Sequence, residues 1–142
     1  MGNTTVTIQA MRSSDIPGAL RLWNRSPGTS TNDTPAEIRR YLRRNPGGSF
    51  VAVADGRLVG AVLGGHDGRR GSIWHLAVLP AHRRDGLGRV LVGRAVEVLR
   101  REGIRKINIL VRSDNQGALR FWRRIGWTRY DVANFSIRPR KR

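Results

Sequence analysis

The sequence predicts one mixed α/β domain of the α+β kind, with a central sheet of six to seven strands flanked by about four helices. Short apolar runs rich in β-branched residues are interspersed with segments whose apolar residues recur at helical spacing. Gly, Pro, Asn and Asp turn signals separate these segments. The 142 residues suffice for one hydrophobic core, and no internal repeat or interdomain linker divides them.

The first third of the chain supplies one strand and two helices. Thr5–Ala10 is rich in β-branched residues and predicts a strand. Ser13 or Ser14 would cap a helix with the apolar face Ile16, Ala19, Leu20 and Trp23. A second helix runs from the capping box Thr34–Glu37 to about Arg44.

The middle of the chain is predicted to consist of strands, and helices and strands alternate after it. Phe50–Ala54 and Leu58–Gly64 would pair antiparallel through the turn signal Asp55-Gly56. Ile73–Leu79 is a continuous apolar run, which is typical of a central strand buried on both faces. The remaining elements are a helix over Gly88–Glu102, a strand over Ile107–Val111, a helix capped by Asp114 or Asn115, and a closing hairpin of Trp127–Asp131 with Phe135–Ile137.

The composition is strongly basic, with 27 Lys and Arg against 10 Asp and Glu and a formal net charge of +17. This excess favours an anionic partner. Nucleic acid, an acidic protein face and a phosphorylated cofactor remain open, as does a solvated surface without a partner. The absence of Cys excludes a Cys-based acyl-enzyme intermediate and a Cys-ligated metal. The three His residues do not fall at metal-ligand spacing, so no metal is expected.

The sequence also predicts where the protein resides. No apolar run approaches the roughly 20 residues that a membrane helix needs. Met1–Arg12 lacks the apolar core of a signal peptide. Together with the absence of Cys, these features lead us to expect a cytoplasmic protein with no membrane partner.

The most informative segment joins the central apolar strand to the long helix after it. Gly86 and Gly88 would let the backbone approach a phosphate closely, because no Cβ stands in the way. A helix N-terminus offers unpaired N–H groups and a positive dipole end. Arg83, Arg84 and Arg89 add positive charge. The segment therefore predicts a pyrophosphate site, with an ordinary strand-to-helix turn as the alternative. It does not fit the dinucleotide-binding or P-loop patterns.

Two motifs resemble those of the GNAT N-acetyltransferase superfamily. Arg83-x-x-Gly86-x-Gly88 looks like the family's Arg/Gln-x-x-Gly-x-Gly/Ala motif, and it lies between the fourth strand and the third helix as in that family. Asn115–Trp127 resembles the motif Asn-x-x-Ala-x-x-Phe-Tyr-x-x-x-Gly-Phe, and Val59–Pro80 is similar to small bacterial members of the YpeA type. The element order agrees over the whole chain. We therefore expect a GNAT-type domain over residues 1–138 and a basic tail over residues 139–142.

The resemblance implies acetyl-CoA as co-substrate. Backbone groups at the end of the fourth strand would hold the pantetheine arm and polarise the thioester carbonyl, and the Gly-rich turn would hold the pyrophosphate. The implied cofactor-binding residues are Leu76, Ala77, Val78, Arg83, Arg84, Asp85, Gly86, Leu87, Gly88, Arg89 and Asn115. The charge of Asp85 opposes a pyrophosphate unless the side chain points away or pairs with a neighbouring Arg.

Acetyl transfer to an amine needs a base for the amine and benefits from an acid for the departing thiolate. Members of the family often carry a Glu base on the fourth or fifth strand, whereas this sequence has no acid there and has Leu110 at one such position. His75 is the candidate base on the fourth strand. A hydrogen-bonded core histidine, with a water chain as base, is the alternative. Trp122 replaces the family's usual Tyr and is assigned a positioning role.

The resemblance thus implies direct acetyl transfer in a ternary complex to an amine acceptor, either a small molecule or a protein, by a monomer or homodimer. The acceptor would lie between the early helices and the closing hairpin. Asp33 and Glu37, in the loop over Ser26–Glu37, could attract a cationic amine, although completing the capping box is the favoured role of Glu37. Two other functions remain open. The Arg-rich segments are compatible with a nucleic-acid-binding module, and the missing family acid and base are compatible with a GNAT domain that binds acetyl-CoA without catalysis.

Overall fold

The computed structural model describes residues 5–140 of the chain. Lys141 and Arg142, which close the expected basic tail, lie outside the described residues. The chain forms two compact units, one that ends at Leu110 and one that begins at Val111. The first unit contains the sheet and three α-helices, and the second contains a single α-helix followed by an extended segment.

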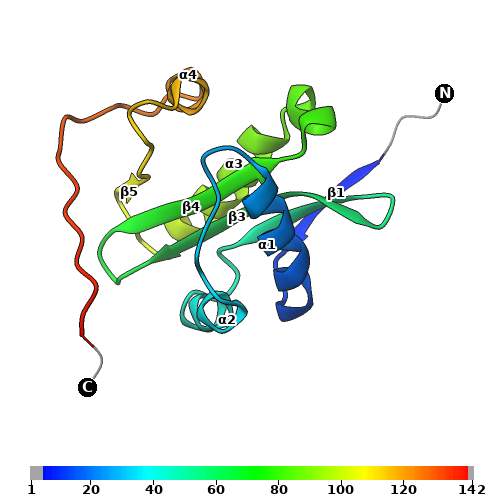
Figure 1. Ribbon diagram of the computed structural model, residues 1–142, viewed down its shortest axis with the longest axis horizontal. Helices are drawn as coiled ribbons and strands as arrows, with labels where there is room; N and C mark the ends of the chain where they lie inside the picture. The colour runs from blue at the N-terminus through cyan, green and yellow to red at the C-terminus, as the bar shows by residue number, and fades with distance from the viewer. Residues whose placement is uncertain (1–4, 141–142) are drawn as a thin grey trace. The chain divides into compact units, whose positions relative to one another are not determined.

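The first unit is built on a five-stranded sheet in the order β1-β2-β3-β4-β5 (Figure 1). The strands are β1 (Val6–Ala10), β2 (Phe50–Ala54), β3 (Arg57–His66), β4 (Gly71–Val78) and β5 (Ile107–Asn108). The first four pair antiparallel, and β5 joins β4 in parallel. The expected hairpin at Asp55-Gly56 is confirmed, because both residues have the positive φ that a tight two-residue turn requires, 50° and 72°.

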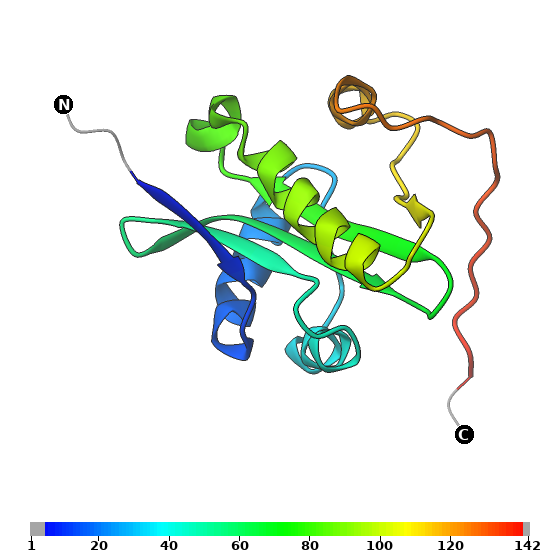
Figure 2. The same cartoon turned by 180° about the vertical axis from the view of Figure 1, so that it is seen from behind.

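Helices cover both faces of this sheet (Figures 1 and 2). The helices α1 (Ile16–Arg25) and α2 (Pro35–Arg44) lie on one face, and α3 (Leu87–Arg101) crosses the other. The core beneath α1 and α2 includes Trp23 and Ile38, both almost fully buried. Within residues 5–140, no helix has the length and apolar character needed to cross a membrane.

The starts of the first two helices differ in how well the sequence predicts them. The capping box of α2 is confirmed: Thr34 Oγ1 accepts the N–H of Glu37 at 3.1 Å, and Glu37 Oε1 accepts the N–H of Thr34 at 2.9 Å. The predicted Ser cap of α1 is wrong. Ser13–Asp15 forms a 3₁₀ turn, and the Asp15 carboxylate accepts the N–H of Arg12 at 2.8 Å. A carboxylate is a stronger acceptor than a hydroxyl, so Asp15 provides the polar contact at this helix start.

The helix α3 packs closely on β3 because the strand presents glycine to it. A Cβ at Gly60 would lie 3.0 Å from Leu91 Cδ1. A Cβ at Gly64 would lie 3.0 Å from the Ala95 Cβ and 2.5 Å from the backbone oxygen of Gly48. The second contact involves backbone that cannot rotate away, so Gly64 has no room for a side chain.

We expect Gly64→Ala to lower the free energy of unfolding by about 1–3 kcal/mol, the usual cost of overpacking a core. Gly93→Ala is the matched control, because Gly93 lies on the exposed side of α3 with nothing within 4 Å of a Cβ. That substitution should raise the free energy of unfolding by about 0.5–1 kcal/mol through helix propensity. Urea unfolding of both variants measures the difference. Equal stabilities would contradict the close approach of β3 to its neighbours.

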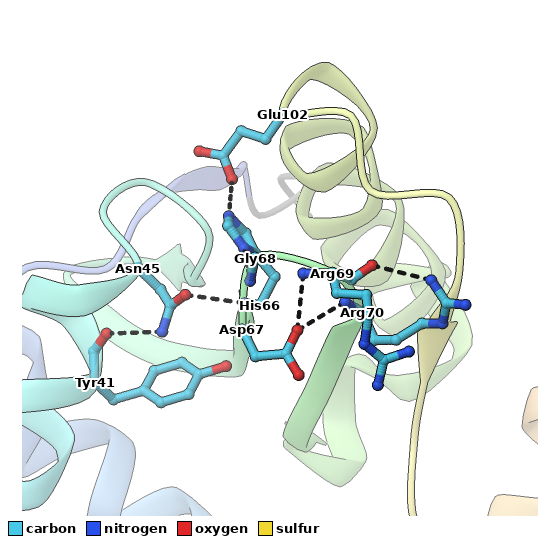
Figure 3. A network of polar contacts seen from close by, with 8 residues as sticks. All are labelled: Tyr41, Asn45, His66, Asp67, Gly68, Arg69, Arg70 and Glu102. Atoms are coloured by element: carbon cyan, nitrogen blue, oxygen red, sulfur yellow. Dashed lines mark hydrogen bonds and ion pairs between the residues drawn. The ribbon is translucent and has the colours of Figure 1, made fainter.

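The turn between β3 and β4 is held by a polar network centred on His66 (Figure 3). Its Nε2 lies 2.8 Å from Glu102 Oε2, and its Nδ1 accepts the N–H of Gly68 at 2.9 Å. A nitrogen that accepts carries no proton, so the imidazole is neutral with its proton on Nε2. The backbone N–H of His66 donates to Asn45 Oδ1 at 2.9 Å. These contacts tie the turn to the ends of α2 and α3.

Asp67 closes the same turn from within. Its Oδ1 accepts the N–H of Arg70 at 2.8 Å and the N–H of Arg69 at 2.9 Å. These hydrogen bonds stabilise the ionised carboxylate and hold the pKa of Asp67 below its ordinary value. The resulting stability is present above the pKa of an unfolded Asp, about 3.9, and is lost as the pH falls through the lower folded pKa.

The sheet has fewer strands than the six to seven that the sequence predicts. The strand expected over Ile107–Val111 is only two residues long, Ile107–Asn108. The closing hairpin is wrong: residues 127–140 carry no strand pairing, and Phe135 and Ile137 are 92% and 86% exposed. The connection between the two predicted strands has no Gly for a tight turn, and an isolated hairpin that buries no face is only marginally stable. The second unit therefore consists of α4 (Gln116–Arg124) and extended chain.

Candidate active site

The second half of β4 has an open edge on the side of β5. The strand β5 pairs with β4 only at Gly71 and Ser72, so from Ile73 to Val78 no strand of the described chain covers that edge. Successive residues of a strand point their N–H and C=O groups to alternate sides, so part of this backbone faces the open edge. The segment Leu76–Val78, which the family resemblance assigns to the pantetheine arm, lies in this open half.

A β-bulge interrupts the pairing of β3 and β4 at His75. The register shifts between the pairs Ala61–Ala77 and Leu63–Trp74. His75 has a φ of 53°, in the left-handed region that residues with side chains rarely adopt. Because the bulge breaks the alternation of the strand, Trp74 and His75 line the same cavity although they are consecutive.

The strand β4 leads through a 3₁₀ turn, Pro80–Asp85, into α3. Gly86 caps α3 in the left-handed conformation with a φ of 74°, and no side chain within the described residues caps the helix. A Cβ at Gly86 would have nothing within 4 Å, so the space above the helix end is open. The side chain of Leu87 is buried and anchors the first turn, whereas Arg84 and Arg89 are exposed.

Two charged residues of the turn have local partners. The Arg83 Nε donates to the backbone oxygen of Val78 at 3.0 Å, which braces the end of β4. Asp85 Oδ2 lies 3.6 Å from His82 Nδ1. The sequence left open whether Asp85 points away or pairs with a neighbouring Arg, and in the structure its nearest charged contact is with His82. The carboxylate is 59% exposed, so its opposition to a phosphate at the helix end is screened by solvent.

A cavity of about 360 Å³ lies within the first unit. Its walls come from the connection between α1 and α2, from α2 itself, and from β3 and β4. His75 Nε2 and Asp33 Oδ2 stand 3.1 Å apart at this cavity. An ionised carboxylate only accepts hydrogen bonds, so Nε2 donates to Asp33, and the lone pair of the ring, when the ring is neutral, lies on Nδ1. The arrangement is a histidine held in one tautomer by a carboxylate.

Two aromatic side chains fix the surroundings of this couple. The ring of Trp23 lies against that of His75, with centroids 5.2 Å apart and planes at 51°. Trp23 is completely buried, so His75 rests on a rigid part of the core. Tyr41 forms another wall of the cavity, and burial raises the pKa of its hydroxyl, which therefore stays protonated. The hydroxyl has no hydrogen-bond partner among the described residues.

The second unit carries the remaining residues that the sequence singled out. Asn115 caps α4, with its Oδ1 accepting the N–H of Ala118 at 3.1 Å, so a contact to a cofactor would come from Nδ2. Trp122 is 7% exposed and packs against Phe121 and Trp127, with ring centroids 5.1 Å and 4.6 Å away. These contacts hold the Trp122 ring between two other aromatic side chains.

The candidate site residues of the first unit follow one another closely along the chain: His75, then the segment Leu76–Val78, then the Gly-rich turn. Sequence reasoning missed the direct contact of His75 with Asp33, although it placed Asp33 near the acceptor and His75 on the central strand. It also missed Tyr41 as a wall residue. The helical spacing of Ile38 and Tyr41, which puts both on one face of α2, was the available signal.

Comparisons with known proteins agree with this architecture. Residues 13–127 match the family model described as the acetyltransferase (GNAT) family. An acetyltransferase of Pectobacterium atrosepticum is 33% identical over 132 residues, which cover 92% of this chain and 94% of that protein. The crystal structure of Ard1 from Thermoplasma volcanium has a TM-score of 0.76 at 26% identity, covering 87% of this chain and 82% of its own. The aminoglycoside N-acetyltransferase AAC(6')-Iy in complex with CoA has a TM-score of 0.80 at 17% identity, covering 96% and 97%.

Proposed function

Because the chain belongs to the GNAT acetyltransferase family, we propose that it transfers an acetyl group from acetyl-CoA directly to the nitrogen of an amine. The proposal rests on three features that follow one another directly along the chain. The open half of β4 is followed by a short basic turn and then by the N-terminus of α3, which no side chain of residues 5–140 caps. This sequence of features offers backbone groups to an extended thioester arm and N–H groups to a pyrophosphate.

The residues present fit acetyl-CoA. The N-terminus of α3 ends in open space at Gly86, and the exposed side chains of Arg84 and Arg89 would add positive charge to a pyrophosphate site there. The backbone of Leu76–Val78 would hold the pantetheine arm along the open edge of β4. The co-substrate, when bound, supplies an acetyl group activated as a thioester.

His75 would serve as the general base. Its Nδ1 would take the proton that the amine loses, and the Asp33 carboxylate on Nε2 would stabilise the resulting imidazolium. In the overall transfer a C–N bond forms, the C–S bond breaks, and the sulfur leaves with the bonding electron pair. This sequence has no Glu at the positions where family members often carry the base. The couple of His75 and Asp33 would provide a base instead, which favours a catalytic function over binding of acetyl-CoA alone.

Trp122 would act by packing within the second unit rather than by proton transfer, because an indole N–H has no accessible proton near neutral pH. We expect Trp122→Phe to retain most of the activity, since a ring still fills the space between Phe121 and Trp127. Trp122→Ala should lower the free energy of unfolding by about 3 kcal/mol and reduce the rate. Steady-state kinetics and thermal melts of both variants measure this. A folded but inactive Trp122→Phe would instead assign the indole N–H a polar role.

The proposal is tested by thermal melting with acetyl-CoA. A ligand that binds only the native state at 100 times its dissociation constant adds about 2.7 kcal/mol of stability, so the melting temperature should rise by several degrees. Titration with single-stranded and duplex DNA at several salt concentrations tests the other function that the basic surface allows. No shift with acetyl-CoA together with steep salt-dependent binding of nucleic acid would replace the proposed function.

A further inference from the structure

The cavity beside His75 differs in charge from the rest of the molecule. Asp33 and Glu37 both line it, in a chain that has only 10 acidic residues and a net charge of +17. Asp33 is held by His75, and one oxygen of Glu37 is held by the N–H of Thr34. Both carboxylates are therefore fixed in place rather than free to swing away. The cavity attracts cations locally and repels a ligand that carries a carboxylate.

The remaining walls of the cavity are neutral. Ile38 and Leu63 are 2% and 3% exposed, and Trp74 adds an indole ring. Tyr41 completes this side as a protonated phenol, because burial raises its pKa. These four walls offer no carboxylate to a second positive charge, and burying an unpaired ammonium against them is costly. The walls therefore suit an apolar group next to a single cation.

The size and the position of the cavity suit a binding site for a small amine. A volume of about 360 Å³ falls at the small end of the range for small-molecule sites. His75 lines it, and the next residue along β4 is Leu76, the first of the segment assigned to the pantetheine arm. An amine held by Asp33 would thus lie beside both the base and the strand that presents the thioester.

Resting on the proposed function, we infer that this cavity is the acceptor site and that it takes a small primary amine with one positive charge, an apolar body and no carboxylate. The carboxylates of Asp33 and Glu37 bind the ammonium group, and the apolar walls cover the carbon skeleton. Amino acids are disfavoured by like charge, and polyamines are disfavoured by their second cation. The class predicted is an arylalkyl or alkyl monoamine.

The test compares phenethylamine with phenylalanine, which differ only in the carboxylate, and with spermidine. We expect the kcat/KM of phenethylamine to exceed that of phenylalanine by at least 10-fold, because like charges about 4 Å apart repel by about 1–4 kcal/mol. Spermidine should be at least 10-fold poorer than phenethylamine as well. Calorimetry of phenethylamine with the protein alone, without acetyl-CoA, gives a second readout. Equal use of phenylalanine or spermidine would overturn the inference.

Glu37→Gln sharpens the test, because Gln keeps the oxygen that accepts the N–H of Thr34 and removes only the charge. It should raise the KM for phenethylamine by about 3- to 10-fold, weaken calorimetric binding by a similar factor, and leave the affinity for acetyl-CoA unchanged. Asp55→Asn, in the exposed turn between β2 and β3, is the matched control and should change none of these values. An unchanged KM in Glu37→Gln would overturn the assignment of the cavity.

The melting shift with acetyl-CoA separates failure of the inference from failure of the proposed function. A normal shift without amine selectivity removes the acceptor assignment alone. The loss of any shift, in a protein that still binds phenethylamine by calorimetry, removes the proposed function and leaves the cavity as an amine-binding site.

Discussion

Gly88→Val is expected to weaken acetyl-CoA binding by about 10- to 100-fold, because a branched side chain at the start of α3 would stand between the helix N–H groups and a phosphate. The magnitude is that of one lost hydrogen bond to a charged group, about 1.5–3 kcal/mol. Gly88 is the second residue of α3, whose N-terminus has no side-chain cap among the described residues. Calorimetric titration with acetyl-CoA measures the effect directly.

Gly93→Val is the matched control for this result. It places the same branched residue in the same helix, at an exposed position where a Cβ meets nothing within 4 Å. Its affinity for acetyl-CoA should equal that of the unmodified protein. Gly86→Val should also lose affinity, but its φ of 74° means that the substitution strains the backbone as well. Unchanged affinity in a folded Gly88→Val protein would contradict the phosphate site.

His75→Asn should reduce kcat by about 100-fold or more, the lower end of the range for loss of a general base. Asparagine is the suitable replacement because it tolerates the left-handed backbone, in which His75 has a φ of 53°. The bulge in β4 should therefore survive, and the affinity for acetyl-CoA should be unchanged. The rate at saturating acetyl-CoA and a calorimetric titration with acetyl-CoA check these two expectations.

Asp33→Asn provides a graded comparison for the same role. The amide can still contact Nε2 but carries no charge to stabilise an imidazolium, so kcat should fall by less than in His75→Asn. A His75→Asn protein that is folded, binds acetyl-CoA and retains more than half of its activity would assign proton removal to a water chain.

Local chemistry made much of the fold predictable. The capping box at Thr34 and the Asp55-Gly56 turn each depend on residues within four positions of one another, and both appear where the sequence places them. The Gly-rich motif at Gly86 likewise marks the start of α3 to within one residue. Such features are visible in sequence because the interactions that stabilise them are local.

Features that depend on tertiary structure were not predictable in the same way. Asp33 and His75 are 42 positions apart, and their contact requires the connection between α1 and α2 to fold over β4. The bulge at His75 follows no turn signal, because neither neighbour is a Gly. The closing hairpin was predicted from a local pattern alone, and that prediction was wrong. Apolar alternation around Phe135 suggested strands, yet a strand forms only where a partner and a buried face exist.

Direct transfer of acetyl from acetyl-CoA to an amine can be followed by mass spectrometry with acetyl-CoA labelled in the acetyl carbons. Phenethylamine incubated with the protein should acquire one labelled acetyl group on nitrogen, with one free thiol released per product and no label retained on the protein. The absence of labelled product and of thiol release above the protein-free blank, across a panel of amines that includes phenethylamine, would contradict the acetyltransferase function. Label that accumulates on the protein before the amine is added would contradict direct transfer.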